Sequence, residues 1–300
     1  MKTDHILIIR FSAMGDVAMT VPVVYALAKE YPNLRITMLS QPFARPLFEN
    51  IAPNVSFMEA DIKEEYKGIK GLNALYRRLA AKQFTAIADL HNVLRSSYLR
   101  MRFNLSQNNV AHIDKHRDLR KRLTAMKDKV VEPIPTAFDN YKDVFARLGY
   151  PIKSIDFKSI FPSKGPLRLL PAEIGDKKDF QQWIGIAPFA AHEGKAYPLD
   201  KMEMVIDELL KRHPSARVFL FGGGSQETSL LKDVAQRHKY CTVVPELLHD
   251  LREELILMSN LDVMVSMDSA NMHLASLVGT PVVSVWGATH PYAGFMGWNQ

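Results

Sequence analysis

Apolar residues follow two different periods along this chain. Short continuous apolar runs, typical of strands covered on both faces of a parallel sheet, alternate with stretches whose apolar positions recur every three or four residues. The runs predict strands at residues 5–11, 34–39, 54–58, 84–90, 183–188, 217–221, 242–244, 261–267 and 282–286. The other stretches predict helices at 17–30, 71–82, 138–148, 199–212, 226–238, 251–259 and 270–278, and we expect residues 91–129 to be mostly helical. Such alternation predicts an α/β fold built on parallel sheets.

A change in composition divides the chain. Residues 158–182 contain Pro162, Pro166 and Pro171 among scattered charged residues, which is typical of a linker. We therefore expect two Rossmann-like domains, residues 1–165 and 166–300. Each would bind ligands beyond the carboxyl ends of its strands.

Length and composition agree with this division. Three hundred residues suit two domains of roughly 150 each, and 47% apolar residues are typical of a fully folded protein. No apolar run approaches the ~20 residues of a membrane helix, and the first residues do not resemble a signal peptide. The single Cys241 excludes an internal disulfide framework. We therefore expect a cytoplasmic protein.

Positive charge is concentrated in one segment. The net charge is +6, and residues 95–129 contain ten Lys or Arg against three Asp. This segment is either a solvated helical face or a surface for an anionic substrate, an anionic membrane or a nucleic acid. Tyr98 and Phe103 are its only large aromatic residues, which weakens the nucleic-acid interpretation.

Two junctions between a strand and a helix carry the candidate chemistry. The first predicted strand is followed by Ser12 to Asp16, and the strand at 261–267 is followed by Asp268, Ser269 and Ala270. The first N–H groups of a helix lack partners and its dipole end is positive, so such junctions bind anions. For Asp16 and Asp268 the alternative is a helix cap.

Other polar residues have both a functional and an ordinary interpretation. Lys195 lies in a loop after a strand, where it either reaches a phosphate or is simply solvated. Gly222 to Gly224 either let a ligand approach the backbone closely or simply form a tight turn. A lone His at the position of His273 is more often a packed residue than a catalytic one. No Walker sequence and no metal-ligand spacing is present, so we expect no bound metal.

Five motifs together resemble glycosyltransferase family 9, the ADP-heptose:lipopolysaccharide heptosyltransferases. Their order and spacing match over nearly the whole chain, which makes the set far more specific than any single motif. They are Ser12-Ala13-Met14-Gly15-Asp16 with Thr20-Val21-Pro22, Lys195-Ala196-Tyr197-Pro198, Gly222-Gly223 with Glu227, Asp268 to Ala275, and Trp286-Gly287-Ala288-Thr289.

The chain departs from the family pattern at four places. Tyr197 replaces the usual Trp, and Ala270 replaces a common Gly. His91-Asn92 replaces Gln-Gly in a segment resembling D-x-Q-G-L-x-K-S, which leaves the acceptor's identity open. Family members usually continue into a C-terminal helix, so the resemblance implies a truncated or shortened chain here.

The resemblance implies a GT-B fold with two Rossmann-like domains facing a cleft, and inverting transfer of heptose from ADP-heptose to an inner-core lipopolysaccharide hydroxyl. Asp16 would be the general base, and Lys195 with the Ser269 and Ala270 N–H groups would stabilise departing ADP without a metal. Glu227 would bind the ribose. The remaining donor-site candidates are Ser12, Gly15, Gly223, Asp268 and His273, and the acceptor-site candidates are Arg10, Arg95 and Arg120.

The first domain would bind the acceptor and the second the donor, with peripheral contact to an anionic membrane and no nucleic-acid partner. Three alternatives remain open. They are a GT-B transferase with another donor or acceptor, a non-catalytic sugar-nucleotide binding module, and a basic nucleic-acid binder. The third leaves both strand–helix junctions unexplained, and the second leaves Asp16 without a role.

Overall fold

The computed structural model describes residues 4–180 and 182–300. Met1 to Thr3 and Gln181, the latter in the predicted linker, lie outside the described residues. The chain forms two compact units. Unit 1 comprises residues 1–157 and 292–295, and unit 2 comprises residues 158–291 and 296–300. The linker was predicted at 158–182 with a boundary after residue 165, so this division falls earlier in the chain.

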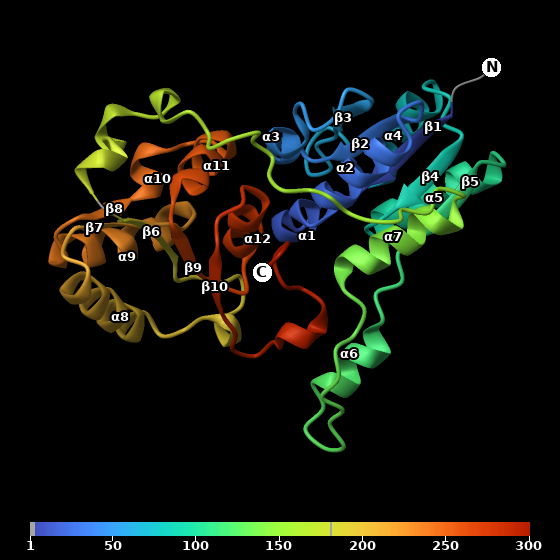
Figure 1. Ribbon diagram of the computed structural model, residues 1–300. Coiled ribbons are helices and arrows are strands. Elements are labelled where there is room, and N and C mark those ends of the chain that lie inside the picture. Colours follow the sequence, from blue (N-terminus) through green and yellow to red (C-terminus); the bar gives the residue numbers. More distant parts are fainter. Residues whose placement is uncertain (1–3, 181) are drawn as a thin grey trace. The chain divides into compact units, whose positions relative to one another are not determined.

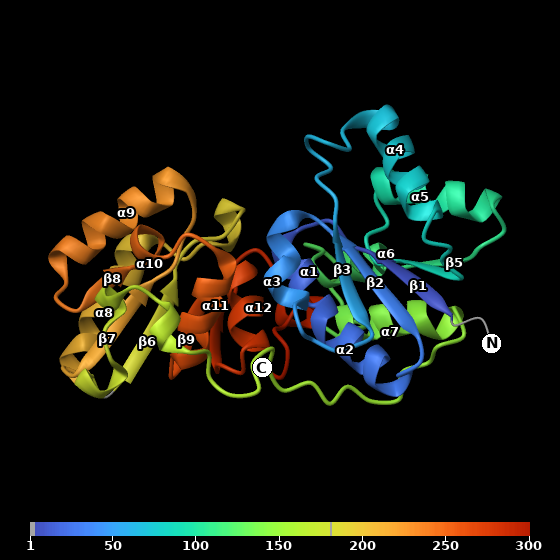
Figure 2. The same cartoon turned by 90° about the horizontal axis from the view of Figure 1, so that it is seen from above.

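Unit 1 is a five-stranded parallel sheet covered by helices on both faces (Figures 1 and 2). Its strands are β1 (His5–Ile9), β2 (Arg35–Ser40), β3 (Val55–Glu59), β4 (Ala86–Asp89) and β5 (Asn109–His112), arranged in the order β3-β2-β1-β4-β5. Its α-helices are α1 (Met14–Ala18), α2 (Thr20–Glu30), α3 (Arg45–Phe48), α4 (Gly68–Ala80), α5 (Leu94–Leu105), α6 (Arg117–Leu123) and α7 (Ala137–Arg147).

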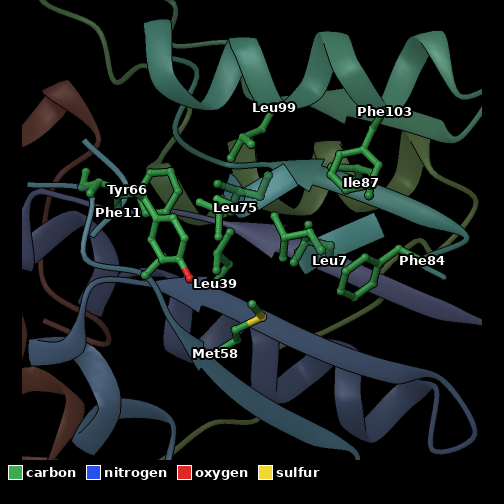
Figure 3. Packing of buried hydrophobic residues seen from close by; sticks show 14 residues of the cluster. Leu7, Phe11, Leu39, Met58, Tyr66, Leu75, Phe84, Ile87, Leu99 and Phe103 are labelled. Carbon is green, nitrogen blue, oxygen red and sulfur yellow. The ribbon is translucent and has the colours of Figure 1, made fainter. Parts of the chain in front are cut away.

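Helices α4 and α5 cover one face of this sheet, and α2 and α7 cover the other (Figure 2). The core under α4 and α5 joins aliphatic side chains of the strands to aromatic and aliphatic side chains of the helices, as Figure 3 shows. Leu7 from β1, Leu75 from α4 and Leu99 from α5 are fully buried there. Burying such a side chain stabilises the fold by about 1.5–3 kcal/mol.

Unit 2 repeats this topology. Its strands are β6 (Gln182–Ala187), β7 (Ala216–Leu220), β8 (Cys241–Val243), β9 (Val263–Met267) and β10 (Val282–Val285), in the order β10-β9-β6-β7-β8. Its α-helices are α8 (Leu199–Arg212), α9 (Gly224–Arg237), α10 (Val244–Leu247), α11 (Leu251–Asn260) and α12 (Ala270–Leu277). In both units the chain starts in the middle strand, builds outward to one edge and then returns to build the other edge.

Two predictions of secondary structure were wrong. Residues 109–112 form the edge strand β5, although 91–129 was expected to be mostly helical; pairing with β4 outweighs a weak local preference. The single helix expected at 17–30 is two helices that meet at Met19. Pro22 is tolerated because it lies in the first turn of α2, where its missing N–H costs no helical hydrogen bond.

Short 3₁₀ turns lie in the loops between these helices and strands. They span Pro42–Ala44, Leu167–Leu169, Ala172–Ile174, Lys177–Asp179, Glu193–Lys195 and Pro291–Ala293. Among the described residues, no helix has both the length and the apolar character needed to cross a membrane.

Candidate functional site

Strand order reverses between β1 and β4 in unit 1 and between β6 and β9 in unit 2. At such a reversal the loops leaving the two neighbouring strands turn to opposite faces of the sheet and leave a crevice, which is the usual ligand site of open α/β sheets. The sequence motifs at 12–16 and at 268–270 follow β1 and β9, so both stand at a reversal.

In unit 1 the crevice is organised by Arg10, directly after β1. Its side chain is 6% exposed, and its guanidinium holds three acceptors. Nη1 donates to the Leu90 carbonyl at 2.6 Å, Nε donates to the Ser12 carbonyl at 2.9 Å, and Nη2 pairs with Asp16 Oδ2 at 2.7 Å. A buried guanidinium is strongly destabilising unless it is paired in this way. Arg10 therefore ties the end of β4 and both sides of the first loop together.

Asp16 is the third residue of α1, so the N-cap role considered from the sequence belongs to Ala13 instead. Its Oδ2 also accepts the Ala13 N–H at 3.2 Å, which satisfies one of the otherwise unpaired donors at this helix start. The side chain is 30% exposed. Asp16 is therefore an oriented carboxylate that solvent or a ligand can reach.

A neutral imidazole lies beside this pair. His91 is buried, its Nδ1 accepts the Phe11 N–H at 3.5 Å, and its Nε2 lies 3.5 Å from Ser12 Oγ. Burial, with Arg10 and Lys115 as the next causes, lowers the pKa of His91 to about 3. The ring is therefore uncharged at neutral pH and adds no further positive charge to a crevice that already holds Arg10.

The segment around His91 explains one departure from the family pattern. Asn92 has φ 47°, a left-handed conformation that favours glycine and that Asn tolerates best among the other residues. The fully buried Asp89 stabilises this turn by accepting the N–H groups of His91 at 2.9 Å and Asn92 at 2.8 Å. Its other oxygen pairs with Arg100 at 2.9 Å. Asp89 is therefore a structural residue of this turn.

Two further cations of unit 1, Lys115 and Arg120, are partly buried. Lys115 is half-buried and donates to the Asn92 carbonyl at 3.3 Å; burial, followed by the charges of Arg10 and Arg117, lowers its pKa. Burial also lowers the pKa of Arg120, whose Nη2 donates to the Lys115 carbonyl at 3.1 Å. The negative charge of Asp16 opposes both shifts and only partly offsets them.

Two of the predicted acceptor-site residues differ in their exposure to solvent. Arg120 packs over the Phe295 ring at 4.6 Å and is half-buried, whereas Arg95, at the start of α5, is exposed. Arg10, the third, is already fully engaged within the protein. Helix α6 and the loop after it extend away from the sheet of unit 1 (Figure 1). They carry most of the remaining Lys and Arg residues of the basic segment 95–129.

In unit 2 the crevice is organised by Asp268, directly after β9. This buried carboxylate accepts hydrogen bonds on Oδ2 from Lys195 Nζ and from Thr289 Oγ1, both at 2.7 Å. Lys195 follows β6 and Thr289 follows β10, so one carboxylate gathers three loops at one end of the sheet. Its charge balances that of Lys195, whose side chain is 25% exposed.

Close packing of two loops holds Lys195 in place. The Ala288 N–H donates to the Gly194 carbonyl at 2.6 Å. A Cβ at Gly287 would lie only 2.4 Å from the same oxygen, so glycine is required at this position.

The start of helix α12 leaves its amide groups available. Ser269 is the N-cap residue, yet its side chain makes no capping hydrogen bond and lies 3.2 Å from Ser266 Oγ. Ala270 is the first helical residue, and His273 is buried one turn further on. The positive end of the helix dipole and the first N–H groups of the helix make this end attractive to an anion.

At the neighbouring strand end, Glu227 of α9 accepts the Gly223 N–H on Oε2 at 2.8 Å. Gly223 is exposed, and a Cβ there would meet nothing within 4 Å. The glycine turn after β7 is therefore open to a ligand, and its acid is oriented.

The structure thus brings some of the predicted residues of each unit together, whereas Gly223 and Glu227 lie at the end of β7 and Arg95 is exposed on α5. Ser12, Gly15 and Asp16 share the loop and first helix after β1, while Lys195, Asp268, Ser269 and Ala270 share the strand ends of unit 2. His91, Lys115 and Thr289 were not among the site residues expected from the sequence. The family segment around His91 and the Gly-x-Thr turn at Thr289 were the available signals, and Lys115 had none beyond its place in a basic segment.

Two doubly wound parallel sheets, each with polar residues at its reversal point, define a protein with a GT-B-like fold. The family model of glycosyltransferase family 9 (heptosyltransferase) matches residues 72–296, and the chain belongs to this family. Among the described residues, no group of three or more His, Cys, Asp or Glu is placed to hold a metal ion.

Sequence relatives match nearly the whole chain, and solved structures share its fold. Lipopolysaccharide heptosyltransferase 1 of Campylobacter coli is 23% identical over 96% of this chain and 85% of its own length. The family 9 glycosyltransferase of Veillonella parvula superposes with a TM-score of 0.78 at 19% identity, over 100% of this chain and 86% of that one. E. coli heptosyltransferase WaaC, solved with ADP-2-deoxy-2-fluoro heptose, superposes with a TM-score of 0.69 at 19% identity, over 96% of this chain and 90% of that one.

The contact between Gly287 and Gly194 yields a prediction. Gly287→Ala should lower the thermal midpoint of unfolding, because relieving this overlap should cost about 1–3 kcal/mol, as in other overpacked sites. The matched control is Gly223→Ala, which adds a methyl group to open space at a backbone φ of −145°. Differential scanning calorimetry of both variants measures the effect, and equal midpoints would contradict the close packing.

Proposed function

We propose that this enzyme transfers heptose from ADP-heptose to a hydroxyl of an inner-core lipopolysaccharide acceptor, with inversion and without a metal. Unit 1 binds the acceptor and unit 2 binds the donor. The observation that carries the catalytic part is the Arg10–Asp16 pair, which holds a carboxylate in fixed orientation at the reversal point of unit 1. Family membership and the relatives named as heptosyltransferases support the substrate class.

Asp16 is the general base in this mechanism. Both of its contacts go to Oδ2, so we assign Oδ1 as the atom that takes the proton of the acceptor hydroxyl. As that oxygen attacks the anomeric carbon, the bond from this carbon to the β-phosphate oxygen of the donor breaks on the opposite face, and ADP leaves with the electron pair. One attack from the opposite face inverts the anomeric configuration. Arg10 is a positioning residue here, in place of the acceptor contact expected from the sequence.

Unit 2 stabilises the leaving group. Negative charge builds on the β-phosphate as the bond breaks, and the Ser269 and Ala270 N–H groups with Lys195 are the donors available for it. Lys195 Nζ gives one hydrogen bond to Asp268 and keeps the others for a phosphate. Donors that are already oriented need no reorganisation during the reaction, which makes them effective. Glu227 binds the ribose, and Gly223 lets the nucleotide approach the backbone.

The charge of unit 1 fits an anionic acceptor. Among the described residues, Lys115 and Arg120 each donate to a backbone carbonyl and pair with no carboxylate, and the charge of Asp16 acts on both. A carboxylate or phosphate of the acceptor would neutralise them beside the base. The protruding α6 segment, with Lys121, Arg122 and exposed Met126, suits the surface of an anionic membrane that carries the acceptor.

Replacing the base tests the mechanism directly. Asp16→Asn should lower kcat by about 10²-fold or more, because the amide cannot take the proton, while donor KM stays nearly unchanged. Asn retains an oxygen that can accept the Ala13 N–H, so the helix start should persist. Steady-state kinetics with ADP-heptose and a truncated lipopolysaccharide acceptor measures both constants. Near-normal turnover would leave Asp16 only a structural role.

The donor site makes a second prediction. ADP should bind in the presence of a chelator, and Lys195→Ala should weaken this binding by about 1.5–3 kcal/mol, the value of a charge-assisted hydrogen bond. Isothermal titration calorimetry measures the affinity, and Lys201→Ala in the same unit is a control for loss of charge alone. Binding that requires added magnesium would contradict the metal-free site.

The basic residues make a third prediction. Changing Arg95 and Arg120 to Gln should raise acceptor KM and leave ADP affinity unchanged, with a smaller difference at high salt because exposed charges are screened beyond ~10 Å at 0.1 M. If the segment serves only membrane attachment, the same variant loses binding to anionic liposomes and keeps full activity on a soluble acceptor fragment. Unchanged results in both assays would mean that the segment is only a solvated surface.

A further inference from the structure

Helix α8 of unit 2 exposes an apolar strip that the proposed function does not use. A shallow groove of about 680 Å³ runs along it, lined among others by Tyr197, Lys201, Met204, Val205, Glu208 and Arg212. Met204 is 68% exposed and Val205 is 40% exposed. Two adjacent apolar side chains in the middle of a solvent-facing helix are unusual, because they gain nothing from water.

The opposite face of α8 already attaches the helix to unit 2. Met202 and Ile206 are buried in the core with strands β6 and β7. Glu203 forms a double ion pair with Arg237 of α9 and also contacts His238. The groove residues at 201, 204, 205, 208 and 212 follow the three- and four-residue spacing of the other face. The outer strip is therefore not needed to hold α8 in place.

The charges on this strip are arranged symmetrically. Lys201 and Glu208 lie at equal distances along the helix on either side of a midpoint between Met204 and Val205. If a second α8 packs on this face in the antiparallel direction, with a two-fold axis through that midpoint, each Lys201 faces Glu208 of the other helix. Met204 then meets its own copy, and so does Val205. A self-complementary surface of this kind is what a two-fold interface requires.

We propose that two copies of this chain associate through α8 as an antiparallel helix pair. The centre is formed by Met204 and Val205, and two reciprocal pairs of Lys201 with Glu208 fix the register. Glu208 already pairs with Arg212 of its own helix at 2.6 Å, so in the dimer each of these carboxylates lies between two cations. Antiparallel packing also sets the helix dipoles in the favourable orientation.

The ends of the strip support the same register. Arg212, in the last turn of α8, is placed opposite Tyr197 of the second copy, directly before the first turn. A guanidinium over a tyrosine ring is a favourable contact. A strip of one helix per copy is small compared with permanent interfaces, so the dimer should depend on protein concentration.

Sedimentation velocity over a range of protein concentrations tests this interface. The unaltered protein should show a concentration-dependent dimer. Lys201→Glu and Glu208→Lys should each raise the dimer dissociation constant about tenfold or more, because either change replaces two attractive pairs with two repulsive ones. The double variant K201E/E208K should recover dimerisation, since it restores both pairs with their signs exchanged.

Lys239→Glu is the control, because Lys239 is exposed in the same unit and lies beyond the end of α9, outside α8 and its groove. Circular dichroism confirms that each variant is folded, and the measurement does not involve catalysis, so its outcome is independent of the proposed function. A protein that stays monomeric at all concentrations overturns the proposal. So does a dimer that both single changes leave intact, or a double variant that is no better than the singles.

Discussion

The positions of Arg10, Asp16, Lys195 and Asp268 follow from one constraint on a doubly wound sheet. The first strand of each unit, β1 or β6, lies in the middle of its sheet and is buried. Chain segments leaving it must pass to one face, and those leaving the neighbouring β4 or β9 must pass to the other. The crevice between them is a place at the strand ends where polar groups can gather without being covered by a helix.

Each unit stabilises a buried charge in that crevice in the same way. In unit 1 the buried charge is the cation Arg10, and its partners are a carboxylate and two carbonyls. In unit 2 the buried charge is the anion Asp268, and its partners are a lysine and a threonine. An unpaired charge in either place would be strongly destabilising. The same pairing leaves an oriented and partly exposed group, Asp16 in one case and Lys195 in the other.

In the proposed mechanism, this arrangement separates two chemical tasks. A carboxylate held among cations suits proton removal next to an anionic acceptor, whereas a lysine beside a free helix start suits a phosphate leaving group. His91 is consistent with the first task. Its low pKa keeps it neutral, so it fills space beside Arg10 without adding charge. Family membership then assigns the general reaction, and the residues of each crevice supply the proposed roles.

The sequence by itself determined the class of fold, because alternating buried runs and helical periods are local signals that any parallel α/β sheet must contain. It also located Asp16, Lys195 and Asp268, since each stands in the segment that follows a strand. It did not reveal β5, whose four residues form an edge strand with little buried apolar surface and depend on pairing with β4.

Only the tertiary structure decided what Arg10 does. Its partner Leu90 is eighty residues away, and adjacency of β1 and β4 is what brings that carbonyl to the guanidinium. The same holds for Thr289 and Lys195, which meet at Asp268 because β6, β9 and β10 are neighbours in the sheet. Local patterns show which residues stand at strand ends, but the order of strands decides which of those ends come together.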